Sequence, residues 1–167
     1  MAGLSPEEIK DFIERGAHIA HVATVRPDGR PHVAPVSFGS WDGKAYVAVY
    51  EGTVKLANIR HNPKVALSIA TDERPYKYVV LEGEGRITSE NRDQVLERIL
   101  IGYVGEERGA ALTKEVLART GRTELLVLEV TVDKVLSMHE VEFETLRGRS
   151  IITDGREFGQ PWLDPAP

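Results

Sequence analysis

Residues 17–50 constrain the fold most, because short apolar runs alternate there with tight-turn signals. The turn sequences are PDG at 27–29 and WDG at 41–43, and an Asp-Gly pair between apolar runs is a strong hairpin signal. The apolar runs are Ile19–Val25, His32–Phe38 and Ala45–Tyr50. This stretch therefore predicts a meander of three antiparallel strands.

The second of these strands contains two prolines. Pro31 and Pro35 lie four residues apart, so they belong to the same face of the strand. Proline cannot donate a ladder hydrogen bond and is tolerated mainly at sheet edges, strand starts and bulges. We therefore expect this strand to be irregular or to leave the sheet part-way.

The rest of the chain supplies further strands and several helices. Ser5 and Glu8 have the spacing of a capping box at the start of a helix that Gly16 ends, and Ser89 is expected to cap a later helix. Gly83 and Gly85 indicate a bulge or a tight bend within a strand. The expected helices are 6–15, 53–61, 90–105 and 106–120, and the further strands are 64–70, 76–87 and a strand pair within 123–140.

Most of the expected connections between strands are short or resemble hairpins. This pattern favours an antiparallel barrel with peripheral helices over a parallel α/β sheet. A chain of 167 residues has the length of one domain. We place the folded domain at 1–140 and an extended C-terminal tail at 141–167, which can pack on a partner subunit.

Composition excludes several classes of function. The chain has no cysteine, which excludes disulfides, thiolate metal sites and cysteine nucleophiles, and its net charge of -5 argues against bulk nucleic-acid binding. No signal peptide and no apolar run long enough to span a membrane is present, so we expect a cytoplasmic protein. HExxH, GxSxG and GxxxxGK[ST] motifs are absent from the sequence, and the five histidines have no metal-site spacing.

The short helix at 53–61 is the first candidate site. A helix start offers free N–H groups to an anion, and here Thr53 supplies a hydroxyl while Lys55 and Arg60 supply positive charge. This combination predicts a phosphate site. The alternative is that Thr53 only caps the helix and that the cations are solvated.

A second candidate is the segment DERPYKYV, which brings Arg74, Tyr76, Lys77 and Tyr78 together. Clustered aromatic and cationic side chains can clamp a planar ligand. The two tyrosines can equally be core or interface residues on one face of a strand, and the sequence leaves both interpretations open.

The order of the motifs resembles a known superfamily. Residues 23–70 contain a strand ending in AT, a DGxPxxxPV hairpin, a DG turn and a short helix of the form KxxN[IL]xx[ND]P[KR]V, and YVxxxGxG follows at 78–85. This set resembles the split-barrel superfamily of pyridoxamine-phosphate-oxidase-like flavin and deazaflavin proteins. The resemblance covers residues 10–90, and the last strands fit it loosely.

The resemblance implies a mainly β fold, a six-stranded antiparallel split β-barrel, and a homodimer with cofactor grooves at the interface. It implies that the short helix binds the cofactor phosphate. The cofactor-binding residues implied in this way are Thr53, Lys55, Asn58 and Arg60 at the helix, Pro35, Val36, Ser37 and Phe38 beside the ring system, and Tyr78 near the ring or the other subunit.

Two departures point away from vitamin B6 oxidation. The arginine by which pyridoxamine-phosphate oxidases hold the flavin phosphate is missing from HVAPVSF, and their C-terminal substrate motif is not evident. The KxxN helix is closer to the branch of deazaflavin-dependent reductases, whose members bind coenzyme F-420, FMN or other planar ligands.

We therefore expect an oxidoreductase that uses FMN or coenzyme F-420 to transfer a hydride to or from a small unsaturated or planar substrate. A catalytic triad or metal is not required, because the cofactor carries the difficult step and the protein orients it. The alternatives are a flavin- or haem-binding protein without turnover, and a structural dimer whose groove is empty.

Overall fold

A computed structural model describes residues 3–15, 17–120, 125–139 and 156–158. The elements in chain order are α1 (Pro6–Arg15), β1 (Ala20–Val25), β2 (Pro31–Val36), β3 (Phe38–Trp41), β4 (Lys44–Tyr50), α2 (Val54–His61), β5 (Lys64–Ala70), β6 (Lys77–Thr88), α3 (Arg92–Val104), α4 (Glu106–Thr120), β7 (Leu125–His139) and β8 (Arg156–Phe158).

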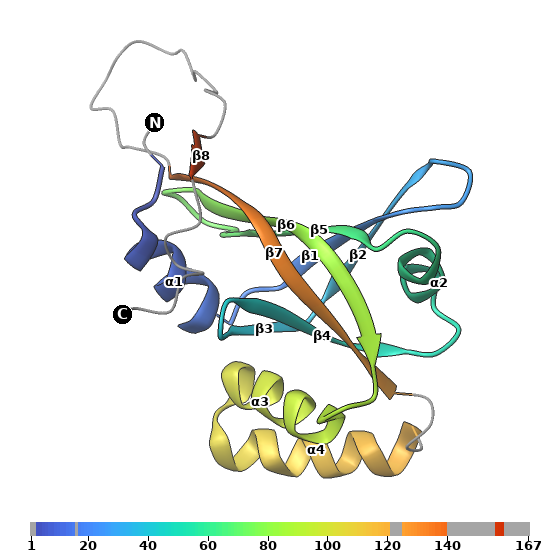
Figure 1. The fold of residues 1–167 in the computed structure, drawn as a ribbon. Helices are drawn as coiled ribbons and strands as arrows, with labels where there is room; N and C mark the ends of the chain where they lie inside the picture. Colours follow the sequence, from blue (N-terminus) through green and yellow to red (C-terminus); the bar gives the residue numbers. More distant parts are fainter. Residues whose placement is uncertain (1–2, 16, 121–124, 140–155, 159–167) are drawn as a thin grey trace.

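The strands form one antiparallel sheet in the order β2-β1-β5-β6-β7-β4-β3, and β8 pairs with β7 off this path. The sheet curls into a half-barrel with helices at its periphery (Figure 1). This confirms the predicted split-barrel architecture, although the path has seven strands where six were expected. Because β2 and β3 end the path on opposite edges yet only Ser37 separates them in the chain, the sheet must curl back on itself.

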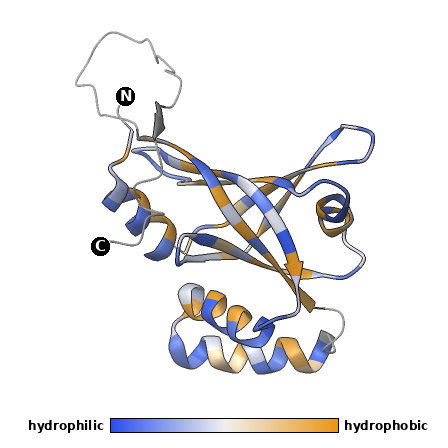
Figure 2. Ribbon diagram, in the orientation of Figure 1, coloured by the Kyte–Doolittle hydropathy of each residue, from blue (hydrophilic) through white to orange (hydrophobic). Residues whose placement is uncertain are grey.

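The core fills the inside of this curl. Hydrophobic residues alternate with hydrophilic ones along β6 and β7 (Figure 2), as expected for strands with one buried face. Two helices contribute to the same core from opposite ends of the sheet, α1 through Ile9 and Ile13 and α2 through Leu56 and Ile59. The barrel is therefore closed at its α2 end by a short helix with two apolar anchors.

A second, smaller cluster of buried hydrophobic residues lies between α3 and the sheet. Val95 and Ile99 of this helix pack with Val127, and Trp41 and Tyr46 of the β3–β4 hairpin cover them. The Trp41 and Tyr46 rings are stacked with centroids 4.2 Å apart. Helix α4 packs on the side of α3 that faces away from the sheet (Figure 1).

Several local predictions are confirmed. The backbone N–H of Ser5 donates to Glu8 Oε2 at 2.7 Å, and the Glu8 N–H donates to Ser5 Oγ at 3.3 Å, which completes the capping box. Asp42 and Gly43 both have positive φ, 52° and 70°, as a type I′ hairpin turn requires. The strand with two prolines, β2, lies on a sheet edge and ends at Val36.

Three predictions are wrong. The stretch expected as a meander of three strands forms four, because the expected strand His32–Phe38 breaks at Ser37 and its two parts, β2 and β3, lie on opposite edges of the sheet. The segment expected as a strand pair is one strand, β7, which continues through Asp133 because that residue is the extra one at a bulge opposite Glu82 and Gly83. The N-cap of α3 is Asn91 rather than Ser89, and Asn91 has left-handed dihedral angles (φ 50°, ψ 20°). Gly16 and most of the tail at 141–167 lie outside the described residues.

Candidate functional site

Helix α2 connects β4 to β5 and begins after a tight turn at Gly52, whose φ of 79° suits glycine. Thr53 occupies the N-cap position, but its hydroxyl donates backward to the Tyr50 carbonyl at 2.9 Å and makes no capping hydrogen bond to the helix. The first-turn N–H groups of α2 are therefore left uncapped by Thr53, and no acidic side chain occupies the first turn. Such a helix start favours an anion.

Lys55 lies in this first turn. Its side chain is half-buried, and the described residues provide it with no ion-pair partner within 4.0 Å. A cation held close to uncapped helix N–H groups adds a compact positive charge to the same place. The site is thus able to bind one phosphate group through charge and backbone donors together.

Arg60 has a different environment. Its guanidinium forms a two-point ion pair with the Glu51 carboxylate, with N–O distances of 2.6 and 2.8 Å. The hydrogen bond from Arg60 lowers the pKa of Glu51, and the hydrogen bond to Glu51 raises the pKa of Arg60. Both side chains are exposed. The ion pair links the last turn of α2 to the turn before the helix, and the Glu51 carboxylate neutralises part of the charge of Arg60.

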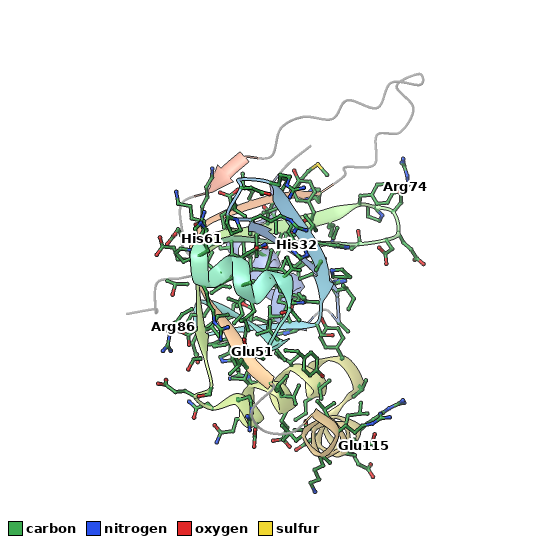
Figure 3. The ribbon with its side chains drawn as sticks, turned by 90° about the vertical axis from the view of Figure 1, so that its right-hand side faces the viewer. His32, Glu51, His61, Arg74, Arg86 and Glu115 are labelled. Carbon is green, nitrogen blue, oxygen red and sulfur yellow. The ribbon has the colours of Figure 1, made fainter. Side chains whose placement is uncertain are left out.

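Asn58 points into the barrel. Its side chain is 3% exposed, and its amide Nδ2 donates to Thr24 Oγ1 of β1 at 2.9 Å. Thr24 is itself 2% exposed and lies opposite His32 of β2 in the strand register. Figure 3 looks onto α2, with His32, Glu51 and His61 labelled around it.

The residues expected beside the ring system lie where β2 ends and β3 begins. Pro35 and Ser37 are exposed and Val36 is half-buried, whereas Phe38 is 3% exposed and belongs to the core. Only part of this group therefore has a surface that a ligand can reach in one protomer.

Tyr103 of α3 fixes this break between strands. Its hydroxyl accepts a hydrogen bond from the Phe38 N–H at 3.2 Å and donates to the His18 carbonyl. Burial raises the pKa of Tyr103, and hydrogen bonds from Phe38 and Ser37 oppose that increase. Tyr103 is not among the residues singled out from the sequence; the available signal was a phenol in an otherwise aliphatic stripe of its helix.

Tyr78 lies far from α2 within one protomer. It pairs with Ala70, the last residue of β5, while α2 immediately precedes Lys64 at the other end of that strand. Six residues of strand span about 20 Å. The neighbouring Arg74 guanidinium lies over the Tyr76 ring, 5.1 Å from its centroid, and Figure 3 places Arg74 away from α2.

The outer face of the β1–β2 hairpin is largely apolar, with His21 opposite Pro35 as its polar member. Pro31, Val33 and Pro35 project from β2 on the face turned away from the core, and Val33 is 58% exposed. Ala23 and Val25 continue this face onto β1, where they pair with Val33 and Pro31. Contiguous exposed apolar surface of this kind is typical of an interaction site.

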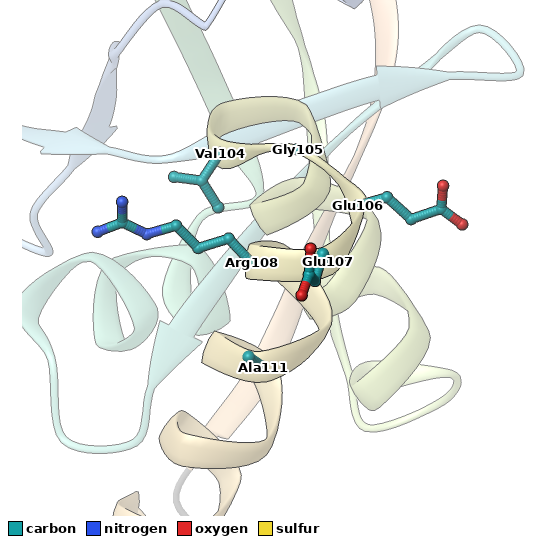
Figure 4. A pocket seen from close by; sticks show the side chains of 6 residues that line it. All are labelled: Val104, Gly105, Glu106, Glu107, Arg108 and Ala111. Atoms are coloured by element: carbon teal, nitrogen blue, oxygen red, sulfur yellow. The ribbon is translucent and has the colours of Figure 1, made fainter.

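A shallow hollow of about 410 Å³ lies at the junction of α3 and α4 (Figure 4). It is lined by Val104, Gly105, Glu106, Glu107, Arg108 and Ala111. Two carboxylates already occupy this helix start, which disfavours a further anion there. The hollow is distant from α2 (Figure 1) and is not part of the candidate site.

The described residues contain neither a membrane-spanning helix nor a cluster of metal-binding side chains. None of the helices in the described part of the chain has the length and apolar character needed to cross a bilayer. Within the same residues, no group of three His, Asp or Glu side chains is arranged to hold a metal ion.

The chain has structural relatives that are distant in sequence. A conserved hypothetical protein from Mycobacterium tuberculosis matches with a TM-score of 0.71 at 19% identity, over 87% of this chain and 93% of that one. An F420 reductase matches with a TM-score of 0.60 at 22% identity, over 75% and 94%. A heme binding protein from Mycobacterium smegmatis matches with a TM-score of 0.64 at 16% identity, over 98% and 61%. These likenesses establish the fold alone.

The comparison of sequence with protein families is more specific. No curated protein sequence matches the chain. The profile of the pyridoxamine 5'-phosphate oxidase family, however, matches residues 5–139, which include every described element except β8. Together with the split-barrel sheet, this match shows that the chain belongs to the pyridoxamine 5'-phosphate oxidase family.

Proposed function

We propose that the protein is an oxidoreductase that uses FMN or the deazaflavin coenzyme F-420 to transfer a hydride to or from a small unsaturated or planar compound. The observation that carries this proposal is the start of α2, where Lys55 lies in the first turn next to N–H groups that Thr53 does not cap. FMN and coenzyme F-420 share a redox-active ring with an anionic tail, and α2 offers the chemistry to hold such a tail.

The chain's own residues then have separate tasks. Lys55 and the first-turn amides of α2 bind the anionic tail, and the Thr53 hydroxyl orients the turn that leads into them. Pro35, Val36 and Ser37, where β2 ends, are suited to line the ring, since backbone groups at a strand break are free to contact a ligand. When bound, the cofactor supplies the hydride chemistry.

A second copy of the chain completes the site in this proposal. Tyr78 and the Arg74–Tyr76 pair are about 20 Å from α2 along β5, so they can approach the cofactor of the partner protomer more readily than their own. The largely apolar outer face of β1 and β2, with Val33 at its centre, offers a surface for that second copy.

A specific observation favours one other function, the binding of a planar ligand without turnover. The heme binding protein aligns over 98% of this chain, more than the F420 reductase does. The similarity to the F420 reductase carries no more weight than the similarity to the heme binding protein, because both sequence identities are under 25%.

Titration of the purified protein with FMN, coenzyme F-420 and haem, followed by absorbance and fluorescence, separates these functions. Saturable binding of FMN or coenzyme F-420, followed by reduction or oxidation of the bound cofactor by a small substrate, supports the oxidoreductase. Binding of haem alone supports the second function. Absence of binding for all three contradicts both.

A further inference from the structure

The interior contact between α2 and β1 is polar in an otherwise apolar part of the core. Asn58 Nδ2 donates to Thr24 Oγ1 at 2.9 Å, and both side chains are almost completely buried. The neighbours of Asn58 that anchor α2, Leu56 and Ile59, are aliphatic. A hydrogen bond, unlike an apolar contact, depends on the direction from donor to acceptor.

The two kinds of anchor constrain α2 differently. Burial of Leu56 and Ile59 fixes how deeply the helix sits, but hydrophobic contact has no preferred direction. The hydrogen bond from Asn58 tolerates only a narrow interval of distances and angles. It therefore fixes the rotation of the helix about its own axis.

That rotation determines where Lys55 lies. Lys55 precedes Asn58 by three residues, and side chains three residues apart in a helix lie on the same face. A turn of α2 that moved Asn58 away from Thr24 would move Lys55 and the first-turn N–H groups with it.

The hydrogen bond also has a direction that extends to β2. Because Thr24 Oγ1 accepts from Asn58, its own proton remains free to donate, and His32 Nδ1 lies 3.5 Å away as the cross-strand partner. This second contact is at the outer limit of a hydrogen bond, so the Asn58–Thr24 hydrogen bond is the one that holds α2.

From this geometry we infer that Asn58 and Thr24 form a latch that positions α2, so that Asn58 contributes to anion binding through the placement of Lys55 and not as a ligand. Asn58 is thus a positioning residue. The inference concerns the site of the proposed function and relies on it for the identity of the anion, but the latch itself is a property of the cofactor-free protein.

The first experiment examines the cofactor-free protein. Thr24→Val and Asn58→Leu should accelerate hydrogen exchange of the α2 backbone amides, while the amides of α4 serve as an internal reference. Thr24→Ser retains the hydroxyl and should preserve the wild-type exchange. Unchanged α2 exchange in both disruptive variants would overturn the latch.

The second experiment measures affinity for FMN and coenzyme F-420 at several salt concentrations. Thr24→Val and Asn58→Leu should each weaken binding by about fivefold or more, and the double variant should be no weaker than the worse single variant, because one interaction is lost in all three. Each should also reduce the salt dependence of binding, since Lys55 is displaced. A purely structural role would lower the melting temperature and leave that dependence unchanged, which would contradict the inference.

A direct ligand role for Asn58 has its own signature. In that case Asn58→Leu would weaken binding while Thr24→Val would not, and the inference would be wrong. If Asn58→Leu does not fold, Asn58→Gln, which keeps the amide but displaces it by one methylene, should give the same loss of affinity. If the wild type binds neither cofactor, the proposed function fails, and the hydrogen-exchange measurements still decide whether the latch exists.

Discussion

The hydroxyl of Tyr103 accepts a hydrogen bond from the backbone N–H of Phe38, at the residue where β3 begins. The same hydroxyl donates to the His18 carbonyl, so one side chain of α3 holds both the β2–β3 break and the segment before β1. Tyr103→Phe should therefore leave two partly buried polar groups without this partner and lower the free energy of unfolding by about 1–3 kcal/mol. Urea denaturation measures this change.

Tyr50→Phe is the matched control for that variant. Tyr50 is 43% exposed, and the same removal of a phenol oxygen there should change stability by less than about 0.5 kcal/mol. Equal effects in the two variants would show that the Tyr103 hydroxyl does not hold the break.

Gly83 occupies a position that no side chain can share. A Cβ atom at this bulge would lie 2.0 Å from the Thr131 carbonyl oxygen, which is backbone and cannot move aside cheaply. Gly83→Ala should destabilise the protein by more than about 3 kcal/mol. The midpoint of thermal unfolding provides the measurement.

The opposite result is expected at Gly102, in the exposed part of α3. A Cβ there meets no atom within 4 Å, and alanine is the better helix former, so Gly102→Ala should stabilise the protein by about 0.5–1 kcal/mol.

A Gly83→Ala protein as stable as the wild type would contradict the close approach of β6 and β7 at the bulge.

Lys55→Ala should weaken binding of FMN or coenzyme F-420 by about 1–3 kcal/mol, roughly 5- to 150-fold, because one charge-assisted contact is lost. Fluorescence titration measures the affinity. Lys114→Ala on the exposed face of α4 removes the same charge at a distance and should leave affinity nearly unchanged. Unaltered affinity in Lys55→Ala would remove α2 from the proposed site.

Glu51 should limit anion affinity, because it neutralises part of the charge of Arg60 in the last turn of α2. Glu51→Gln is expected to strengthen cofactor binding at low salt, with the gain disappearing as ionic strength increases. In an Arg60→Gln background the same substitution should give a smaller gain. Isothermal titration of the four proteins gives the comparison, and a loss of affinity on removing the carboxylate would argue for a direct role of Glu51.

Acid should weaken the start of α1. Hydrogen bonds from the Ser5 N–H and hydroxyl lower the pKa of Glu8, so the folded state favours the charged carboxylate. A lowered pKa stabilises the fold at pH values above the ordinary pKa of a glutamate, and this stabilisation is lost as the pH falls through the lowered pKa. Glu8→Gln and Ser5→Ala should each reduce the acid dependence of unfolding in that pH range. An unchanged slope in both would contradict the capping box.

Most of the fold could be predicted because its signals are local. The Asp42–Gly43 turn, the capping box of α1 and the two prolines of β2 each depend on residues close in sequence, and each is confirmed. The continuity of β7 could not be predicted in the same way. Asp133 resembles a turn residue when read alone, and only the opposite strand, with Gly83 at the bulge, explains why the strand continues.

The candidate site shows the same contrast between local sequence signals and contacts that depend on the completed fold. The basic start of α2 could be predicted from Lys55 and its neighbours, and the structure supplies the uncapped amides. The pairing of Arg60 with Glu51, the burial of Asn58 against Thr24 and the hydroxyl contacts of Tyr103 join residues between 9 and 85 positions apart. Side-chain contacts over such separations depend on the completed fold and have no periodic signature in the sequence.

Only Ser37 joins β2 to β3, so this connection cannot accommodate an extra residue. Insertion of one amino acid beside Ser37 would move β3 by one position, and a shift of one position in a strand turns every side chain to the opposite face. Phe38 and Ser40 would then leave the interior together. Changes in loop length are therefore tolerable at the hairpin tip around residues 26–30, where exposed turn residues can absorb them, and intolerable at the seam of the barrel.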